Sequence, residues 1–442
     1  MLKNLIRNIR DLRIFLILWS TQSFSSLGSA TTNFALVIWT YEQQGSAFTT
    51  ALLAICSYAP YVLFSIFAGT LSDRLNKKAV MLVSDSFAAL CTIFVLILLT
   101  AGKLEIWHLY IINALNGLMN TVQRPAAEVA VSLLTPKRYY QSVSGLRYFS
   151  NSLNTVLTPV LAAALLSLAG LRFVILFDLF SFFIAFGVLI RFIKIPEEKP
   201  SEKSGNETLL QSSKRGLQYL TENRGILDLI LFLAVINFTA SIYNAALPAM
   251  LLSRSLGGNL ALGMVNTVTG IATLFGSILV TLLPAPKSRV RMICNCLLFS
   301  MSTENFILAF GRNIQVWCLG AALGWIAIPV MGANMEALLR LKIPVEMQGR
   351  VYSARNTLQF FTIPLGYLCG GLLVDRIFEP FMKLQKSGSM LTGLFGTGKG
   401  SGAALLFFVI GVFGLLSCLP FRMDRHIWGL EDGISHKERD IY

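Results

Sequence analysis

Long apolar stretches recur along the whole chain and are separated by short polar segments. Most of them reach the length of about 20 residues that an α-helix needs to cross the hydrocarbon core of a bilayer. We therefore expect an all-α integral membrane protein. The pattern predicts twelve transmembrane helices, at about residues 14–39, 47–71, 79–101, 106–127, 143–169, 172–193, 226–252, 260–283, 290–311, 314–339, 352–378 and 401–421.

The longest polar segment divides these spans into two groups of six. The predicted organisation is an N-terminal six-helix half (1–193), a cytoplasmic linker (194–225), a C-terminal six-helix half (226–424) and a cytoplasmic tail (425–442). Parallel six-span repeats occur in one architecture of membrane transporters, so we expect two pseudo-symmetric halves. Weak matches between the halves support this, since Asn151, Leu153 and Pro159 recur 205 residues later as Asn356, Leu358 and Pro364.

Composition and charge favour a membrane protein over a soluble one. Hydrophobic residues make up 54% of the chain and charged residues only 14%, whereas soluble domains carry about 25% charged residues. On the predicted topology, 29 of the 37 Lys and Arg residues lie in loops on one side. Because basic loops stay in the cytoplasm, both termini are predicted to be cytoplasmic, in a multi-pass protein of the cytoplasmic membrane. The net charge of +14 then orients the chain, and we expect no nucleic acid partner.

Polar side chains follow helical spacing on the first, fourth, seventh and tenth spans. In hydrocarbon such groups face either a neighbouring helix or a water-filled cavity. Their recurrence on every third span favours one central cavity, whose few charges suit an uncharged or amphiphilic small molecule. The predicted substrate-binding residues are Gln22, Asn33, Asn113, Asn116, Asn120, Asn237, Asn244 and Trp325.

The sharpest motif lies between the second and third spans, from Gly69 to Lys78. It resembles the signature loop of the major facilitator superfamily, Gly-x-x-x-Asp-Arg/Lys-x-Gly-Arg/Lys-Arg/Lys. Asn76 stands where glycine is usual, and Asn also tolerates a left-handed turn. The resemblance implies a twelve-helix bundle in two halves. Anchoring of the loop by its basic residues is the plainer alternative to a gating role.

The resemblance also implies residues that act as a gate. In the family, the motif's aspartate sits against the N-terminus of the eleventh helix, where free N–H groups favour an anion. That helix is expected here to begin near 349–352. The predicted gating residues are Gly69, Asp73, Arg74, Lys77, Lys78 and Asp85.

Other stretches narrow the resemblance to the drug:proton antiporter branch, which includes bacterial macrolide-efflux and siderophore-export proteins. They include Gln22–Gly28, Phe177–Phe182 and Gln348–Ser353. The branch implies alternating access and export of hydrophobic or amphiphilic small molecules, driven by proton entry. We expect a monomer in membrane lipid, with no catalytic residues, metal or other cofactor.

Proton coupling is predicted to involve the intramembrane acids Asp178, Glu304 and Glu128, and Asp85 is a further candidate. A carboxyl group in a low-dielectric site can exchange a proton near neutral pH, although each of these acids can instead serve helix packing. The chain departs from proton-coupled relatives in several places. The first span has no acid, Asn113 replaces an arginine of the fourth span, and Thr158-Pro159 stands in place of Gly-Pro on the fifth.

Three other functions remain open from the sequence. The first is a lipid or lysolipid transporter without proton coupling. The second is a membrane-embedded enzyme, for which no HExxH or GxSxG motif is found. The third is a receptor or scaffold that transports nothing.

Overall fold

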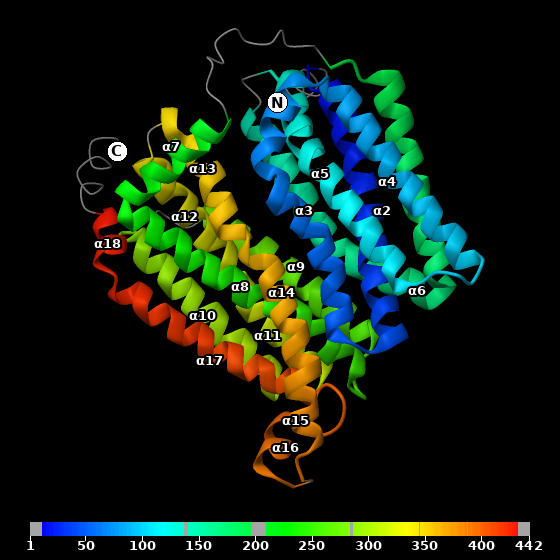
Figure 1. Cartoon of the computed structure of the whole chain (residues 1–442), viewed down its shortest axis with the longest axis vertical. Coiled ribbons are helices and arrows are strands. Elements are labelled where there is room, and N and C mark those ends of the chain that lie inside the picture. The colour runs from blue at the N-terminus through cyan, green and yellow to red at the C-terminus, as the bar shows by residue number, and fades with distance from the viewer. Residues whose placement is uncertain are drawn as a thin grey trace. The chain divides into compact units, whose positions relative to one another are not determined.

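The computed structural model describes residues 11–136, 140–195, 209–282, 286–343, 345–386 and 388–431, in which all regular structure is helical (Figure 1). The first group of helices is α2 (Arg13–Gln44), α3 (Ala47–Arg74), α4 (Lys77–Thr100), α5 (Ile106–Leu134) and α6 (Tyr140–Phe192). The second is α7 (Leu209–Glu222), α8 (Arg224–Ser253), α9 (Asn259–Leu282), α10 (Arg289–Phe310), α11 (Ile314–Ile326) and α12 (Ile328–Lys342). The last is α13 (Val345–Phe360), α14 (Thr362–Leu372), the π-helical turn η2 (Leu373–Phe378), α15 (Glu379–Lys383), α16 (Met390–Phe395), α17 (Ser401–Met423), α18 (Arg425–Trp428) and the short η3 (Gly429–Glu431).

Among the described residues, nine helices are long and apolar enough to cross a membrane. The difference from the twelve predicted spans has a physical cause. Helix α6 contains two of the predicted spans, which meet at Gly170, where φ is +75°. Helices α2 and α5 fall short because they carry the polar stripes expected to line a cavity. Every predicted span therefore corresponds to a described helix or part of one, and the chain is a multi-pass α-helical membrane protein.

Two predicted spans are interrupted. The tenth is divided into α11 and α12 at Ala327, just before Pro329, which has no N–H to continue the helical ladder. The eleventh comprises α13, α14 and the wider turn η2. Such π-type turns are frequently found at functional sites.

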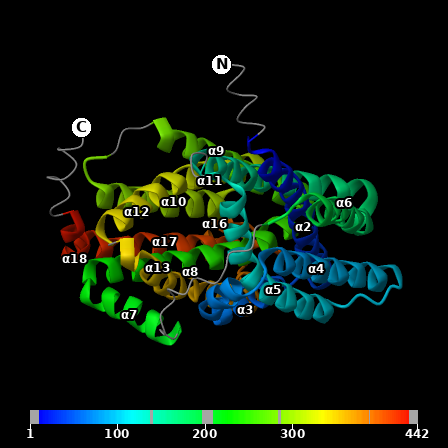
Figure 2. The same cartoon turned by 90° about the horizontal axis from the view of Figure 1, so that it is seen from above.

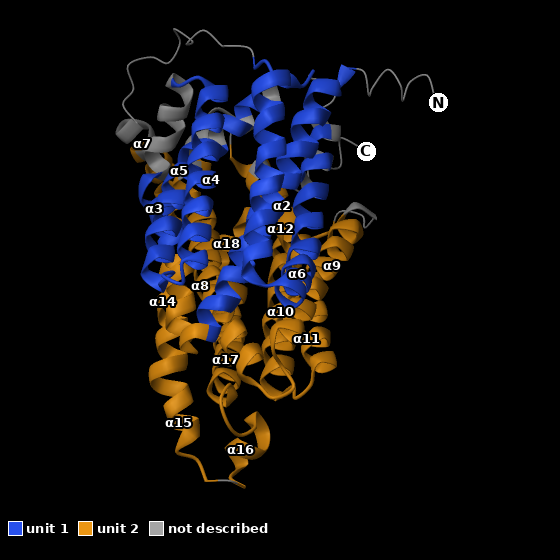
Figure 3. Cartoon of the chain, turned by 90° about the vertical axis from the view of Figure 1, so that its right-hand side faces the viewer, with its two compact units in different colours: residues 1–42, 56–206 blue, residues 43–55, 207–442 orange. Residues whose placement is uncertain are grey.

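The chain forms two compact units (Figure 3). Unit 1 contains residues 1–42 and 56–206, and unit 2 contains residues 43–55 and 207–442. Residues 43–55 are predicted to belong to the N-terminal half, and they group with unit 2 in the structure. The boundary between the units consequently falls inside the continuous helix α3.

Unit 2 has an extended apolar core. Helix α10 packs against α11, α12 and α17, and α8 packs against α14 and α17 (Figure 2). The core reaches past the predicted spans, since it includes Leu220 of α7 and Ile427 of α18. The helix α7 therefore fixes the end of the predicted linker to the second unit.

Unit 1 exposes large apolar side chains on the outer faces of its helices. Leu90 on α4 and Phe180 and Phe183 on α6 are each at least 60% exposed. A soluble domain would bury side chains of this size. Their exposure is the pattern expected of helices that face lipid.

Candidate functional site

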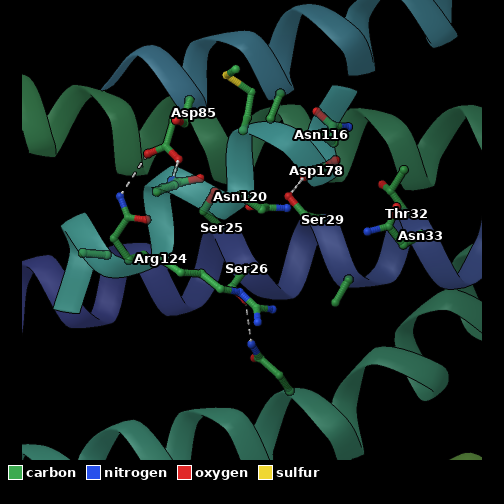
Figure 4. Close-up of a pocket in the computed structure, with 18 of the residues that line it drawn as sticks. Ser25, Ser26, Ser29, Thr32, Asn33, Asp85, Asn116, Asn120, Arg124 and Asp178 are labelled. Carbon is green, nitrogen blue, oxygen red and sulfur yellow. Dashed lines mark hydrogen bonds between the residues drawn. The ribbon is translucent and has the colours of Figure 1, made fainter. Parts of the chain in front are cut away.

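A pocket of about 590 Å³ lies within unit 1, between α2, α4, α5 and α6 (Figure 4). All five of the unit 1 residues predicted to contact substrate line it: Gln22, Asn33, Asn113, Asn116 and Asn120. The pocket also holds two acids and two arginines, Asp85, Asp178, Arg124 and Arg147. Its lining therefore mixes polar and apolar side chains and is formally balanced in charge.

Helical spacing explains how these side chains meet. On α2, Gln22, Ser26, Ser29 and Asn33 are three or four residues apart, so they share one face of the helix. The three asparagines of α5 follow the same spacing. Each helix consequently turns a polar stripe into the pocket and keeps its apolar residues for packing and lipid.

Asp178 of α6 is the deepest acid in the pocket. It is 5% exposed, and its Oδ1 accepts a hydrogen bond of 2.9 Å from the Ser29 hydroxyl of α2. The two helices touch closely here, because a Cβ at Gly28 would lie 3.0 Å from the Asp178 Cα. Asp178 is predicted to take part in proton coupling, and it lies in the wall of this pocket.

Asp85 of α4 also belongs to this pocket. Its carboxylate accepts hydrogen bonds from the side-chain amides of Gln22, at 3.4 Å, and Gln123. Asp85 is predicted to act with the gating loop. Its described partners lie instead on α2 and α5, so it connects the third span to the two polar stripes.

Several pocket residues were not predicted. The first part of α6 contributes Arg147, Ser150, Asn151 and Asn154, and the Asn154 amide donates a hydrogen bond of 3.2 Å to the Ser26 hydroxyl. Their spacing of three or four residues is visible in the sequence and would have indicated a fifth-span stripe. The Arg124 guanidinium lies over the Tyr61 ring of α3, 5.6 Å from its centroid.

A second buried acid, Glu304 of α10, lies in unit 2. It is 5% exposed and accepts a hydrogen bond of 2.9 Å from the indole Nε1 of Trp325. The hydroxyl of Tyr243 on α8 lies beside the same carboxyl group. This cluster brings the predicted substrate residue Trp325 and the predicted proton carrier Glu304 into direct contact.

The other predicted residues of unit 2 are not gathered around Glu304. The Asn237 amide on α8 donates a hydrogen bond of 3.2 Å to the carbonyl oxygen of Gln359 on α13, which is a helix-packing contact. Asn244, two turns further along α8, is exposed.

The signature loop is described in part. Gly69 and the side chains of Asp73, Arg74 and Glu128 are not among the described ones. Asn76 caps α4, since its Oδ1 accepts a hydrogen bond of 2.9 Å from the Ala79 N–H. Lys77 donates to the carbonyl oxygen of Leu75 at 3.2 Å. Lys78 reaches the last turn of α6, where it donates to the carbonyl oxygens of Ile190 and Ile193, at 3.0 and 2.7 Å.

The family model described as Major Facilitator Superfamily matches residues 18–367. The chain belongs to the major facilitator superfamily. The resemblance inferred from the signature loop and the twelve spans is thereby confirmed, and the protein is a membrane transporter of this superfamily.

Curated relatives share low identity over most of the chain. Macrolide efflux protein A of Streptococcus pyogenes is 23% identical over 366 residues, which are 82% of this chain and 90% of that protein. Macrolide efflux protein A of Enterococcus faecalis is 22% identical over 73% of this chain and 99% of its own length. The MFS-type transporter YfiS of Bacillus subtilis is 25% identical over 85% of this chain and 89% of its own length.

Solved structures show the same fold. A point mutant of the nucleoside transporter NupG has a TM-score of 0.67 and 13% identity, with 93% of this chain and 99% of that chain covered. A bacterial homologue of the iron transporter ferroportin, in an inward-facing state, also has a TM-score of 0.67, with 17% identity and coverage of 93% and 98%. At these identities the likeness carries the fold alone.

Proposed function

We propose that this transporter exports hydrophobic or amphiphilic small molecules, of the macrolide type, in exchange for protons by alternating access. The pocket of unit 1 carries the proposal. It combines hydroxyl and amide groups with a balanced set of charges, which suits a ligand that has a large apolar body and a few polar groups. The relatives named as macrolide efflux proteins support the same substrate class.

The substrate contacts are proposed for Gln22, Asn33, Asn113, Asn116 and Asn120 of unit 1. Asn237, Asn244 and Trp325, on α8 and α11 of unit 2, are proposed to contact substrate as well. Amides of this kind donate and accept hydrogen bonds at once. They can therefore serve chemically different ligands without a matched charge.

Proton coupling is proposed for the buried acids Asp178 and Glu304, and for Glu128. Asp178 supports this role best because it lines the same pocket as the substrate residues. A proton on its carboxyl group removes a charge from the pocket wall, and loss of that proton restores it. An amphiphilic ligand and a proton then affect each other's binding, which is the linkage that exchange requires.

Gating is proposed for the signature loop, with Asp73 and Arg74 acting with Gly69, Lys77, Lys78 and Asp85. The bonds of Lys78 to the end of α6 support a fixed position for the loop on unit 1. The protein is proposed to lie in the cytoplasmic membrane as a monomer, with both termini cytoplasmic.

The test is accumulation of a radiolabelled macrolide in bacteria deprived of their own exporters. Cells that express the wild-type protein are expected to hold less label than cells with an empty vector, and a protonophore is expected to abolish the difference. Asp178→Asn is expected to behave like the empty vector at equal membrane abundance. Equal accumulation with wild-type protein and empty vector, across macrolides and other amphiphilic drugs, would overturn the proposal.

Export that survives the protonophore would instead favour transport without proton coupling. The matched measurement then uses reconstituted vesicles and a fluorescent lysophospholipid, with no imposed gradient. Flux of the fluorescent lysophospholipid would favour a lipid transporter over a drug exporter as the function of this protein.

A further inference from the structure

The start of α3 is held by an acid more than 300 residues away in the sequence. The Asp375 carboxylate, in the turn η2, accepts hydrogen bonds from the backbone N–H groups of Ala47, at 3.1 Å, and Phe48, at 2.9 Å. It also accepts one from the Ser46 hydroxyl, at 2.5 Å. The Ser46 oxygen in turn accepts the Thr49 N–H at 3.1 Å. One carboxylate thus satisfies, directly or through Ser46, the N–H groups that the first turn of a helix leaves unpaired.

The backbones of the two segments approach closely at the same place. Gly371 lies one turn before Asp375, and a Cβ added there would be 2.5 Å from the Phe48 Cα. Only a residue without a side chain fits this contact. Asp375 therefore reaches the end of α3 because Gly371 lets α14 lie against it.

The segment that Asp375 holds is short, and α3 passes from unit 2 into unit 1 just after it. Residues 43–55 belong to unit 2, while the same helix from Cys56 onward belongs to unit 1. Pro60 follows within the helix and provides no N–H for the carbonyl oxygen of Cys56. Beyond the boundary, a Cβ at Gly117 of α5 would clash with the backbone carbonyl of Ser57. Glycine contacts thus fasten α3 to one unit before the boundary and to the other after it.

We propose that Asp375 is a positioning residue of the transport cycle, a latch that holds the start of α3 against α14 and must release when this end of the transporter opens. The inference rests on the proposed transport by alternating access. On the predicted topology this is the outer end, opposite the basic loops.

The latch is strong enough to bias the two states. Hydrogen bonds to a charged acceptor are stronger than those between neutral groups. Loss of even one such bond corresponds to a change of about tenfold or more in the ratio of closed to open states. The carboxylate makes three of these contacts, so its removal is expected to exceed that factor.

The experiment measures the distance between the two segments in the full-length protein. Nitroxide labels are placed at Gln43→Cys and Lys383→Cys, two exposed positions, in a chain whose seven native cysteines are replaced. Double electron–electron resonance then reports the closed and open distances in lipid nanodiscs. Asp375→Ala is expected to raise the ratio of long to short distances at least about tenfold, and Ser46→Ala to raise it less.

Glu379→Ala is the matched control. Glu379 lies one turn after Asp375 and also caps a helix, since it accepts the N–H groups of Gly400, at 2.9 Å, and Ala403, at 3.2 Å, at the start of α17. Because α17, unlike α3, does not continue into unit 1, loss of the Glu379 cap is expected to leave the distances unchanged. Gly371→Leu separates the segments by bulk and tests the latch if Asp375→Ala fails to fold.

The latch is overturned if Asp375→Ala keeps the wild-type distances, or if Glu379→Ala shifts them equally. The measurement needs neither substrate nor proton gradient. Failure of export in the wild-type protein would therefore count against the proposed function. The distances between the two labels would still show whether Asp375 holds the start of α3.

Discussion

The indole of Trp325 donates its N–H to the carboxylate of Glu304 at 2.9 Å, so α11 and α10 share a buried polar contact. The approach is close because Gly324 lies against the Glu304 side chain, where a larger residue would clash. A buried carboxyl group is costly unless it is hydrogen-bonded or neutral. Glu304 accepts a hydrogen bond from Trp325, and its carboxyl group can also be neutralised by binding a proton.

Glu304→Gln is expected to abolish proton-driven export while the protein still folds. Glutamine keeps the size of the side chain and an oxygen that can accept the Trp325 N–H, but it cannot carry a proton. Efflux from proteoliposomes under an imposed pH gradient checks this, together with substrate exchange at equal pH, which should survive. Trp325→Phe is the companion variant, and it is expected to lose about 1 kcal/mol of stability by removing one hydrogen bond. Gradient-driven efflux at the wild-type rate in Glu304→Gln would remove this acid from the coupling mechanism.

Asp178→Asn is expected to uncouple transport at the pocket of unit 1. Asparagine can still accept the Ser29 hydroxyl, whose bond to Asp178 is 2.9 Å, so the contact between α2 and α6 is retained. Ser29→Ala removes that hydrogen bond but leaves the acid, and it is expected to keep proton-driven efflux. Parallel efflux assays separate the two roles. Loss of proton-driven efflux in Ser29→Ala, with efflux retained in Asp178→Asn, would show that the Ser29–Asp178 hydrogen bond serves helix packing only.

Gly117→Ala is expected to destabilise the protein by about 1–3 kcal/mol, because overpacking forces backbone shifts. The added methyl group would clash with the Ser57 carbonyl on α3, which cannot move alone. Gly187→Ala on α6 is the matched control, since nothing lies within 4 Å of its added Cβ. Thermal midpoints measured by fluorescence-detected size exclusion should fall for the first variant and not for the second. A fall of equal size in both would argue against close packing of α3 on α5.

Asp73→Asn is expected to abolish most transport while the protein still inserts in the membrane. The change removes the charge with which the family's loop faces the start of the eleventh helix, and charge-assisted bonds are the strong ones. Membrane abundance on immunoblots and macrolide efflux are measured together. Normal efflux in Asp73→Asn would end the gating assignment of the signature loop.

Topology reporters provide an independent test of the predicted spans. Fusions within 194–225 are expected to report the cytoplasm, and fusions within 380–400 the outer side, because an odd number of predicted spans lies between them. Paired phosphatase and fluorescent-protein reporters distinguish the two sides. The same side for both segments would refute the twelve-span topology.

Much of the fold could be predicted from the sequence, because lipid imposes a simple rule on helix length and polarity. The pocket of unit 1 was partly predictable for the same reason, since Gln22, Asn33 and the asparagines of α5 had to face away from hydrocarbon. Asn154 was missed because its stripe lies among many apolar residues of α6. Its helical spacing from Arg147 was nevertheless present in the sequence.

Other features depend on contacts that no local pattern encodes. Asp85 sits close in sequence to the signature loop, which suggested a gate, yet its partners Gln22 and Gln123 come from distant spans. The bond between Asp375 and the start of α3 joins residues over 300 positions apart. Neither Asp85 nor Asp375 belongs to a periodic polar stripe, so only the packing of the helices shows which residues they contact.

The polarity of α2 and α5 also bears on how the chain is made. These helices line the pocket, and among the described helices that match single predicted spans they are the ones too polar to qualify as membrane spans by hydropathy. A segment that carries several amides partitions poorly into lipid when it leaves the translocon alone. The amide side chains proposed to bind the ligand thus hinder insertion of α2 and α5 into the bilayer. The strongly apolar α4 would have to hold these two helices in the bilayer until the helix bundle is complete.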